Sequence, residues 1–340
     1  MNTRERFAAI MNFKPFDRLP VMEWAVWWDK TIARWESEGL PSGMNRYEIT
    51  RYFDLDMHYQ HWIRPRSSET PQPSHHGAGI MENETDFEKK IQPHLFNMPE
   101  EISPQTYDLW NKEQEAGEAV IWITLEGFFW LPRTLFGIEG HLYAFYDQPE
   151  LMKRINNYNA EWMLRIIERV CKYCTPDFVT FAEDMSYNHG PMIGKDLFDE
   201  FVKPYYEMVV PEFKKRGIKT IIDSDGNIHD AAFWFEEAGL EGILPLERQA
   251  GVDSNKIRRE HPKQIYIGAF DKMVMDKGEA AMRTEFERLL PVAARGGFII
   301  SCDHQTPPGV SLNDYKLYLK LFREYADLAG KQSQKTIDQG

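Results

Sequence analysis

The sequence predicts an α/β protein in which parallel strands close into a single (β/α)8 TIM barrel. Short apolar segments alternate with longer amphipathic segments over most of the chain, as expected for parallel strands joined by helices. Eight segments qualify as strands, and this number favours a closed barrel over an open doubly wound sheet. Several of them end in acidic or other reactive side chains. Because barrel active sites form at the carboxyl ends of the strands, the pattern predicts an enzyme site as well as a fold.

The composition supports one large globular unit and excludes several classes of partner. The chain has 340 residues with 21 Phe, 15 Tyr and 10 Trp, enough apolar side chains for the core of a barrel. A formal net charge of −13 disfavours nucleic acid, whose phosphates require clustered Lys and Arg. No segment reads as a signal peptide or a membrane span, and the 3 cysteines do not make a disulfide framework. We therefore expect a cytoplasmic protein without a membrane or nucleic-acid partner.

The first residues predict a helix followed by the first strand. Residues 3–12 have the spacing of a short amphipathic helix, with Thr3 as its N-cap. Residues 18–24 follow as an apolar segment that ends in an acid, Glu23, and we interpret this segment as a strand.

Residues 62–118 interrupt the regular pattern. Prolines and histidines punctuate this polar segment, which lacks long periodicity. We interpret it as an insertion after the second strand, residues 54–61, with a β-hairpin around residues 79–92. The pair His75 and His76 fits a solvated loop better than a metal site.

A regular alternation of strands and helices occupies the rest of the chain. The remaining strand candidates are residues 119–126, 177–184, 218–223, 242–247, 264–269 and 297–302. The helix candidates are residues 140–174, 196–216, 230–238, 254–260, 279–294 and 312–329. Residues 1–330 are therefore predicted to form one barrel domain, and residues 331–340 a flexible tail.

Reactive side chains follow almost every predicted strand. They are Glu23, Tyr59, His61, Glu126, Glu183, Asp184, Asp223, Asp225, Glu247, Asp271, Cys302, Asp303 and His304. At one barrel mouth, so many carboxylates would repel each other unless they are protonated, paired with Arg or bound to a cation. A mixed set of Asp, Cys and His suits zinc with an open position for substrate. A metal-free acidic pocket fits the same residues equally well.

Aromatic side chains also lie close to the predicted strand ends. Trp24, Trp27 and Trp28 follow the first strand, and Phe128 and Trp130 follow the third. Either these rings pack against the core, or they form the wall of a pocket for an aromatic substrate.

Four parts of the sequence resemble the uroporphyrinogen decarboxylase superfamily. They are residues 3–7 with 17–21, 183–185 with 190–193, 223–227, and 296–308. The resemblance runs nearly end to end. It implies a (β/α)8 barrel and one of two chemistries, namely decarboxylation of a porphyrinogen or zinc-dependent methyl transfer to a corrinoid cofactor.

The decarboxylases of this superfamily resemble the chain less well at the positions that bind substrate. They carry an Arg-rich stretch after the first strand that binds the carboxylates of the substrate, whereas residues 24–29 here read WAVWWD. Their catalytic aspartate lies in an S-D-I-type turn after the second strand, and no such turn follows Asp56. An acidic mouth would also repel an anionic porphyrinogen.

The corrinoid methyltransferases place zinc on H-x-C after one strand and on a Cys after the last strand. The corresponding positions here are Asp223, Asp225 and Cys302, and His304 lies two residues further on. The resemblance therefore implies a zinc site made of Asp223, Asp225, Cys302 and His304. Because two ligands are carboxylates, the metal would be a stronger Lewis acid, better suited to an ether oxygen than to a thiol.

The expected function is methyl transfer from a small O-methyl donor, such as a methoxylated aromatic, to the cobalt of a corrinoid. The corrinoid (cobalamin) would come from a partner protein or from solution, because the chain contains no D-x-H-x-x-G motif. The expected catalytic residues are Glu183, Asp184, Asp223, Glu247 and His304, and the expected substrate-binding residues are Trp24, Trp27, Trp28, Phe128 and Trp130. Two alternatives are a decarboxylase of uroporphyrinogen or a related acid, and a non-catalytic protein that binds an aromatic ligand. A homodimer is one option for the oligomeric state.

Overall fold

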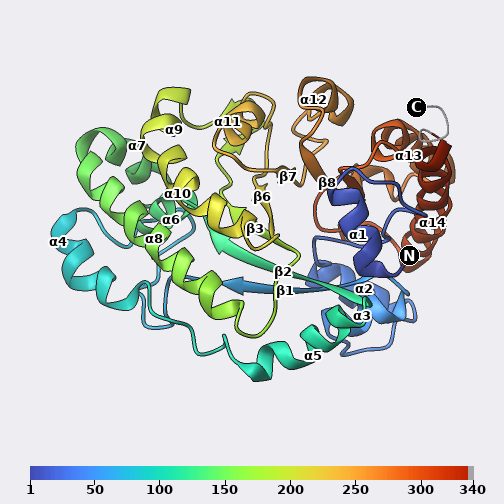
Figure 1. The fold of residues 1–340 in the computed structure, drawn as a ribbon, viewed down its shortest axis with the longest axis horizontal. Helices are drawn as coiled ribbons and strands as arrows, with labels where there is room; N and C mark the ends of the chain where they lie inside the picture. Colours follow the sequence, from blue (N-terminus) through green and yellow to red (C-terminus); the bar gives the residue numbers. More distant parts are fainter. Residues whose placement is uncertain (336–340) are drawn as a thin grey trace.

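Seven parallel strands form one curved sheet at the centre of the computed structural model, which describes residues 1–335 (Figure 1). The strand order across the sheet is β1-β2-β3-β6-β7-β8-β9. The strands are β1 (Met57–Ile63), β2 (Ala119–Glu126), β3 (Phe178–Ala182), β6 (Lys219–Asp223), β7 (Gly242–Leu244), β8 (Ile265–Phe270) and β9 (Phe298–Cys302). A separate antiparallel pair consists of β4 (Ser186–Tyr187) and β5 (Gly190–Pro191). The predicted α/β class with parallel strands is confirmed.

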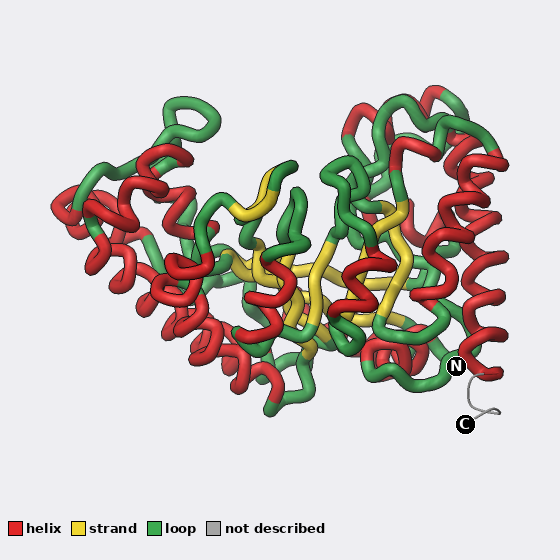
Figure 2. Tube along the Cα trace, turned by 90° about the horizontal axis from the view of Figure 1, so that it is seen from above, coloured by secondary structure: helices red, strands yellow, loops and turns green. Residues whose placement is uncertain are grey.

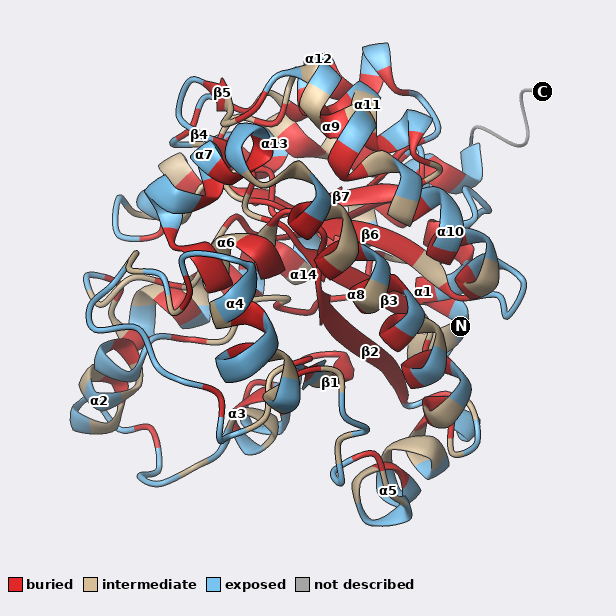
Figure 3. Cartoon of the chain, turned by 90° about the vertical axis from the view of Figure 1, so that its left-hand side faces the viewer, coloured by how far each residue is buried: buried red, intermediate tan, exposed pale blue. Residues whose placement is uncertain are grey.

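Helices cover the outside of this sheet. Figure 2 shows the strands between two groups of helices, and Figure 3 shows the strands buried beneath helices whose outer surfaces are exposed. The longer helices are α1 (Thr3–Met11), α2 (Asp29–Ser37), α5 (Pro104–Glu115), α7 (Ile138–Asp147), α8 (Pro149–Val170), α10 (Lys203–Lys214), α13 (Glu279–Ala293) and α14 (Leu312–Lys335). The shorter ones are α3 (Arg46–Tyr52), α4 (Glu84–Asp86), α6 (Trp130–Phe136), α9 (Lys195–Phe201), α11 (Ala231–Glu237), α12 (Ser254–Glu260) and the 3-10 turn η3 (Lys272–Val274). No helix within residues 1–335 is long and apolar enough to cross a membrane.

The register of the strands brings particular residues into one row at the carboxyl edge. Glu126 of β2 pairs with Ala182 of β3, which in turn pairs with Asp223 of β6. Paired residues in neighbouring parallel strands point to the same face of the sheet. Two residues earlier along these two strands, Thr124 of β2 pairs with Thr180 of β3, and their hydroxyls lie 2.9 Å apart on this same face. The row of Glu126, Ala182 and Asp223 therefore continues a polar face of the sheet up to its edge.

The predicted first strand, residues 18–24, is wrong. These residues run as an irregular segment between β1 and β9: the N–H of Asp56 donates to the carbonyl of Val21 (2.9 Å), and the N–H of Trp24 donates to the Ser301 hydroxyl (3.2 Å). Pro20 has no N–H to offer a neighbouring strand. In addition, the Glu23 side chain accepts the hydrogen bond from the Cys302 N–H (3.0 Å), which a strand backbone would otherwise accept. Within residues 1–335, no eighth strand therefore closes the sheet into a complete barrel.

The predicted β-hairpin at residues 79–92 is also wrong, because this segment is helical. Helix α4 continues into a π-helical turn, η1 (Phe87–Ile91), and a 3-10 turn, η2 (Gln92–His94). The Asn83 side chain caps the start by accepting from the N–H of Asp86 (3.1 Å). Phe87 and Ile91, four residues apart, are both buried on one helical face.

The two chain ends differ from the prediction in detail. Asn2, not Thr3, caps α1, since its side chain accepts from the N–H of Glu5 (2.8 Å). Residues 331–335, predicted as part of a flexible tail, belong to helix α14. The remainder of the predicted tail, 336–340, lies outside the described residues.

Candidate functional site

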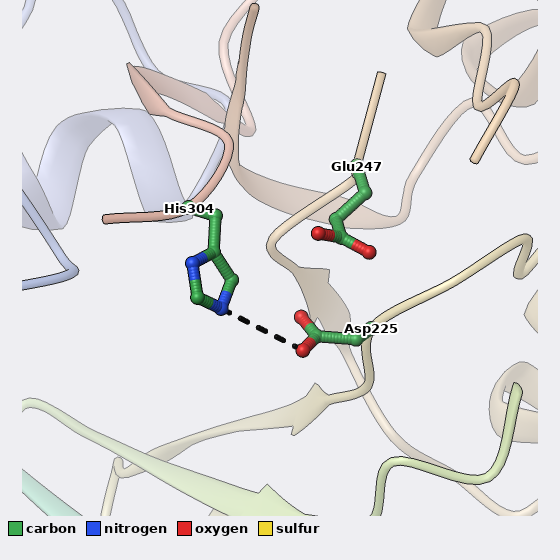
Figure 4. A group of neighbouring side chains, drawn as sticks. All are labelled: Asp225, Glu247 and His304. Atoms are coloured by element: carbon green, nitrogen blue, oxygen red, sulfur yellow. Dashed lines mark ion pairs between the residues drawn. The ribbon is translucent and has the colours of Figure 1, made fainter. Parts of the chain in front are cut away.

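Three side chains converge at the carboxyl edge of the sheet, as Figure 4 shows. They are Asp225 after β6, Glu247 after β7 and His304 after β9, and one potential ligand atom of each lies within 4.8 Å of the others. Asp225 Oδ2 is 3.7 Å from His304 Nε2, and all three residues are half-buried. We call this set the Asp–Glu–His cluster. Of the residues predicted as catalytic or metal-binding, it unites three that lie as far as 79 positions apart in sequence.

Backbone hydrogen bonds hold the carboxylate of Glu247 and the main chain at Asp225. Glu247 Oε2 accepts from the N–H of Gly226 (3.0 Å), and the N–H of Asp225 donates to Asp184 Oδ1 (3.2 Å). Gly226 has φ +83°, and a Cβ there would lie 2.7 Å from the backbone carbon of Ser186, so only glycine fits. Leu246, directly before Glu247, also has a left-handed backbone with φ +64°. A buried Leu rarely adopts this conformation, and such strain is concentrated at functional sites.

The imidazole of His304 is held against an indole ring. The rings of Trp24 and His304 meet edge to face, with centroids 6.3 Å apart at 84°. Trp24 is itself anchored, because its Nε1–H donates to the carbonyl of Cys302 (2.6 Å). Burial, together with the charge of Lys272, lowers the pKa of His304. A neutral imidazole is the form that binds a metal ion.

The surroundings of the cluster contain more acidic than basic groups. Burial, followed by the charges of Asp184 and Glu247, raises the pKa of Asp225 to about 8. Burial and neighbouring acids likewise raise the pKa of Asp303 to about 6, although Lys272 acts in the opposite direction. The Lys272 ammonium lies 3.3 Å from Asp303 and 3.7 Å from Glu247. Because these carboxylates disfavour each other's ionisation, a bound cation would stabilise their charged forms.

The donor set fits a divalent metal ion. Two carboxylates and one imidazole are three suitable ligands for zinc, and three protein ligands leave a coordination position for substrate. The predicted ligands Asp223 and Cys302 are not part of this set. Cys302 is buried, and burial together with Glu23 raises the pKa of its thiol well above the usual value. Asp223 is half-buried beside Asp184 and Asp225, and burial together with these two acids raises its pKa well above the usual value. The third potential ligand is thus the carboxylate of Glu247, whereas the sequence suggested the thiolate of Cys302.

Glu183 lies behind the mouth and holds the start of helix α6. Its carboxylate accepts from the backbone N–H groups of Phe128 (2.8 Å), Phe129 (2.8 Å) and Trp130 (2.9 Å), and from the hydroxyl of Tyr206. These are the free donors at a helix N-terminus, where a carboxylate is favoured. A Cβ at residue 127 would collide with this carboxyl group, so Gly127 is required. Burial raises the pKa of Glu183 to about 7, against the effect of these donors. In this structure Glu183 positions a helix.

Two of the five residues of the predicted aromatic wall belong to the core. Trp27 is 6% exposed and packs against Trp35, Phe53 and Tyr315, and Phe128 is fully buried. Trp28 is 42% exposed. Of the five predicted aromatic residues, Trp24 contacts the cluster, and Trp130 lines a separate cavity described below.

A cavity of about 360 Å³ opens directly onto the cluster. Its lining consists of Ser186, Tyr187, Asn188, His189, Asp225, Gly226 and Glu247. The β4–β5 hairpin therefore forms one wall, fixed by the hydrogen bond from the Asn227 N–H to the Tyr187 carbonyl (2.9 Å). Neither this hairpin nor Lys272 was identified from the sequence. The signal for Lys272 was its position directly after Asp271, at the end of a predicted strand.

Comparison with known proteins adds independent information. The solved structure of a methyltransferase from Methanosarcina mazei aligns over 96% of this chain and 99% of that chain, with a TM-score of 0.68 and 12% sequence identity. A putative vitamin-B12-independent methionine synthase from Listeria monocytogenes aligns over 93% of this chain and 98% of that chain, with a TM-score of 0.48 and 12% identity. No curated protein matches the sequence. At 12% identity the first likeness shows a shared fold.

The model of the family described as uroporphyrinogen decarboxylase (URO-D) matches residues 113–325. This match covers more than half of the chain, including β2 through β9 and all three residues of the Asp–Glu–His cluster. The chain therefore belongs to the uroporphyrinogen decarboxylase family.

Proposed function

We propose that this protein is a methyltransferase that moves a methyl group from a small methoxylated aromatic donor to the cobalt of a corrinoid. The observation that carries the proposal is the Asp–Glu–His cluster, a three-ligand set facing a small cavity. The corrinoid comes from a partner protein or from solution. The methyl–oxygen bond of the donor breaks, the methyl group passes to reduced cobalt, and the electron pair stays on the departing phenoxide.

The chemistry assigned to the cluster depends on oxygen activation. Asp225, Glu247 and His304 would hold a divalent metal such as zinc, which when bound supplies a Lewis acid for the ether oxygen. The Lys272 ammonium, 3.7 Å from Glu247, adds positive charge where negative charge develops on the leaving oxygen. Trp24 fixes the imidazole plane of His304 and offers apolar surface to the donor ring.

Two observations favour methyl transfer over porphyrinogen decarboxylation. The cavity of about 360 Å³ is at the lower end of the size range of small-molecule sites and suits a single ring. The acids Asp184, Asp225, Glu247 and Asp303 around it would repel the carboxylates of a porphyrinogen. The fold shared with a methyltransferase supports the same choice.

The test is methylation of cobalt. Zinc-loaded protein is mixed anaerobically with reduced cobalamin and a methoxyphenol, and the absorption spectrum of the cobalt is followed. We expect methylcobalamin to form with the wild type, and Asp225→Asn or Glu247→Gln to slow its formation by about 100-fold or more, as expected when a metal ligand is lost. Glu118→Gln, at the exposed amino end of β2, is the matched control and should react normally.

Metal analysis of the same proteins separates binding from chemistry. We expect about one zinc ion per wild-type chain, as for a catalytic zinc site, and none in the double variant of Asp225 and Glu247. Loss of carbon dioxide from uroporphyrinogen, without methylcobalamin formation from any of a panel of methoxyaromatics, would establish the decarboxylase alternative instead.

A further inference from the structure

A second and larger cavity lies on the same edge of the sheet, beyond the start of helix α6. Its volume is about 940 Å³. It lies between the segment that follows β1 on one side and the ends of β2 and α6, at Glu126 and Trp130, on the other. The residues that matter here are Trp62, Arg64, Arg66, Glu126 and Trp130. None of them belongs to the Asp–Glu–His cluster, and the methyl-transfer proposal assigns none of them a role.

The floor of this cavity has an unusual buried carboxylate. Glu126 is 1% exposed, and its Oε1 pairs with Arg66 Nη2 at 2.6 Å. Within residues 1–335, its other oxygen, Oε2, has no hydrogen-bond partner, and neither does the Nε–H of Arg66. Buried polar atoms are nearly always paired, so each exception requires an explanation. An acceptor and a donor that belong to one ion pair match a ligand hydroxyl, which donates one hydrogen bond and accepts another.

The walls of the cavity suit an aromatic ring. Trp62, 40% exposed, and the half-buried Trp130 both line it. Arg64 lies over the Trp62 ring at 5.2 Å, and Arg133 lies over the Trp130 ring at 5.2 Å. Indole rings held in this way present rigid apolar surface for another ring.

The outer rim of the cavity argues against a ligand carboxylate at this place. The exposed side chains of Glu69, Glu100 and Glu101 line it, and they would repel a second anion. A neutral hydroxyl avoids this repulsion. The chemistry of floor, walls and rim together therefore fits a phenol.

The position of Glu126 relates this cavity to the Asp–Glu–His cluster. Glu126, Ala182 and Asp223 lie side by side in neighbouring strands, so Glu126 is two strand spacings, roughly 10 Å, from Asp223. The residue between them in this row is Ala182. Arg133 connects the two regions, since its guanidinium lies over Trp130 and donates to the carbonyl of Asp184 (2.9 Å).

We infer that this cavity binds the hydroxyl end of a phenolic ring, with the hydroxyl donating to Glu126 Oε2 and accepting from Arg66 Nε. Since Oε2 has no solvent-exposed area, a neighbouring side chain has to shift when the phenol binds, and Arg64, whose side chain is 58% exposed, has room to do so. The binding of a phenol in this cavity does not depend on the function proposed above.

Calorimetric titration of metal-free protein without corrinoid tests the inference. Two ligands of similar shape are compared, 4-methoxyphenol and 1,4-dimethoxybenzene, which lacks the hydroxyl. We expect the phenol to bind about 10- to 100-fold more tightly, the range for a hydrogen bond to a charged group. The ultraviolet spectrum of the bound phenol should also shift, because its hydroxyl donates to a carboxylate. Equal affinities without a spectral shift would overturn the inference.

Variants identify the residues responsible. Glu126→Gln keeps the size of the side chain, and we expect it to lower the preference for the phenol by about tenfold while leaving the affinity for dimethoxybenzene unchanged. Glu118→Gln, at the exposed amino end of β2 and outside this cavity, is the control and should behave as wild type. If Glu126→Gln does not fold, Arg66→Gln takes its place with the same expectation. An unchanged preference in the folded variant would refute the assignment.

The result is independent of methyl transfer. A protein that methylates cobalt but shows no preference for the phenol contradicts only this inference. A protein that prefers the phenol through Glu126 but never forms methylcobalamin contradicts only the proposed function.

Discussion

Asp56 and Asp225 lie at opposite ends of the same sheet and are stabilised in opposite ways. Asp56, just before β1, is 8% exposed, and its carboxylate accepts from Arg18 (2.6 and 3.0 Å), Thr3 (2.8 Å) and the N–H of Val21 (2.7 Å). Burial alone would raise the pKa of Asp56, but the hydrogen bonds and charge of Arg18 outweigh it and the pKa is lowered.

Asp225 has the reverse environment. Asp225 lies near Asp184 and Glu247, its carboxylate is 3.7 Å from the imidazole of His304, and its pKa is raised to about 8, chiefly by burial. The amino end of the sheet thus holds an acid that is fully paired by the protein, whereas at the carboxyl end Asp225 lies among other acids. Perturbed groups of the second kind mark functional sites, and barrels in general separate stability and activity between their two ends.

The largest expected effect contrasts these two aspartates by the same isosteric change. Asp56→Asn breaks a buried ion pair and leaves Arg18 without its partner, so we expect the free energy of unfolding to fall by about 3–5 kcal/mol. Asp225→Asn replaces a carboxyl group whose ionisation burial and its neighbours already disfavour, and the metal-free variant should stay within about 1 kcal/mol of wild type. Urea unfolding at neutral pH measures both. Comparable losses in the two variants would contradict the division of labour between the two ends.

A buried histidine provides a third environment. His141 of α7 is fully buried between Phe129 and Phe145, and neither of its ring nitrogens has a hydrogen-bond partner among the described residues. Burial, with the charge of Arg133, lowers its pKa to about 3. Between its unfolded pKa of 6.5 and this folded value, the unfolded chain binds a proton that the native protein does not, so stability falls as the pH falls.

The size of the expected loss in the free energy of unfolding follows from this pH interval. From pH 6.5 down to pH 5, His141 should reduce the free energy of unfolding by about 2 kcal/mol, at 1.36 kcal/mol per pH unit. Denaturant unfolding at several pH values should show a correspondingly shallower dependence in His141→Phe. His75→Phe, in an exposed loop, is the control and should keep the wild-type slope. An unaltered slope in His141→Phe would mean that this imidazole is protonated in the folded protein.

The sequence allowed the strands and their reactive ends to be predicted because both depend on local pattern. Apolar runs such as residues 119–126 form strands wherever they are buried on both faces, and the order of groups along the edge follows from the alternation with helices. The failure at residues 18–24 has a non-local cause. There the side chain of Glu23 and the hydroxyl of Ser301 make the contacts that a strand backbone would have made.

The direction of each side chain beyond a strand end could not be predicted in the same way. Cys302 and His304 are two residues apart, yet one is buried beside Glu23 and the other faces Asp225. Glu247 joins the cluster because Leu246 takes a left-handed backbone conformation that no local motif specifies. The sequence therefore indicates which groups gather at the edge, and tertiary packing decides which of them share a site.

The smallest expected effect concerns Trp24, which contacts the imidazole of His304 without belonging to the Asp–Glu–His cluster. Trp24 holds its place by the Nε1–H bond to the Cys302 carbonyl (2.6 Å), and its ring meets His304 edge to face. Trp24→Phe keeps an aromatic ring but loses the donor, which should cost about 0.5–1.5 kcal/mol of stability. Because the ring would no longer be fixed, the imidazole should be less well oriented, and zinc affinity should fall by about tenfold, as for other outer contacts of metal ligands.

Competition with a chelator measures the zinc affinity. The control is Trp28→Phe, at a tryptophan with an exposed side chain, which should change neither the stability nor the zinc affinity. If Trp24→Phe loses stability but keeps its zinc affinity, the indole serves packing alone, and the orientation of His304 must come from its own loop.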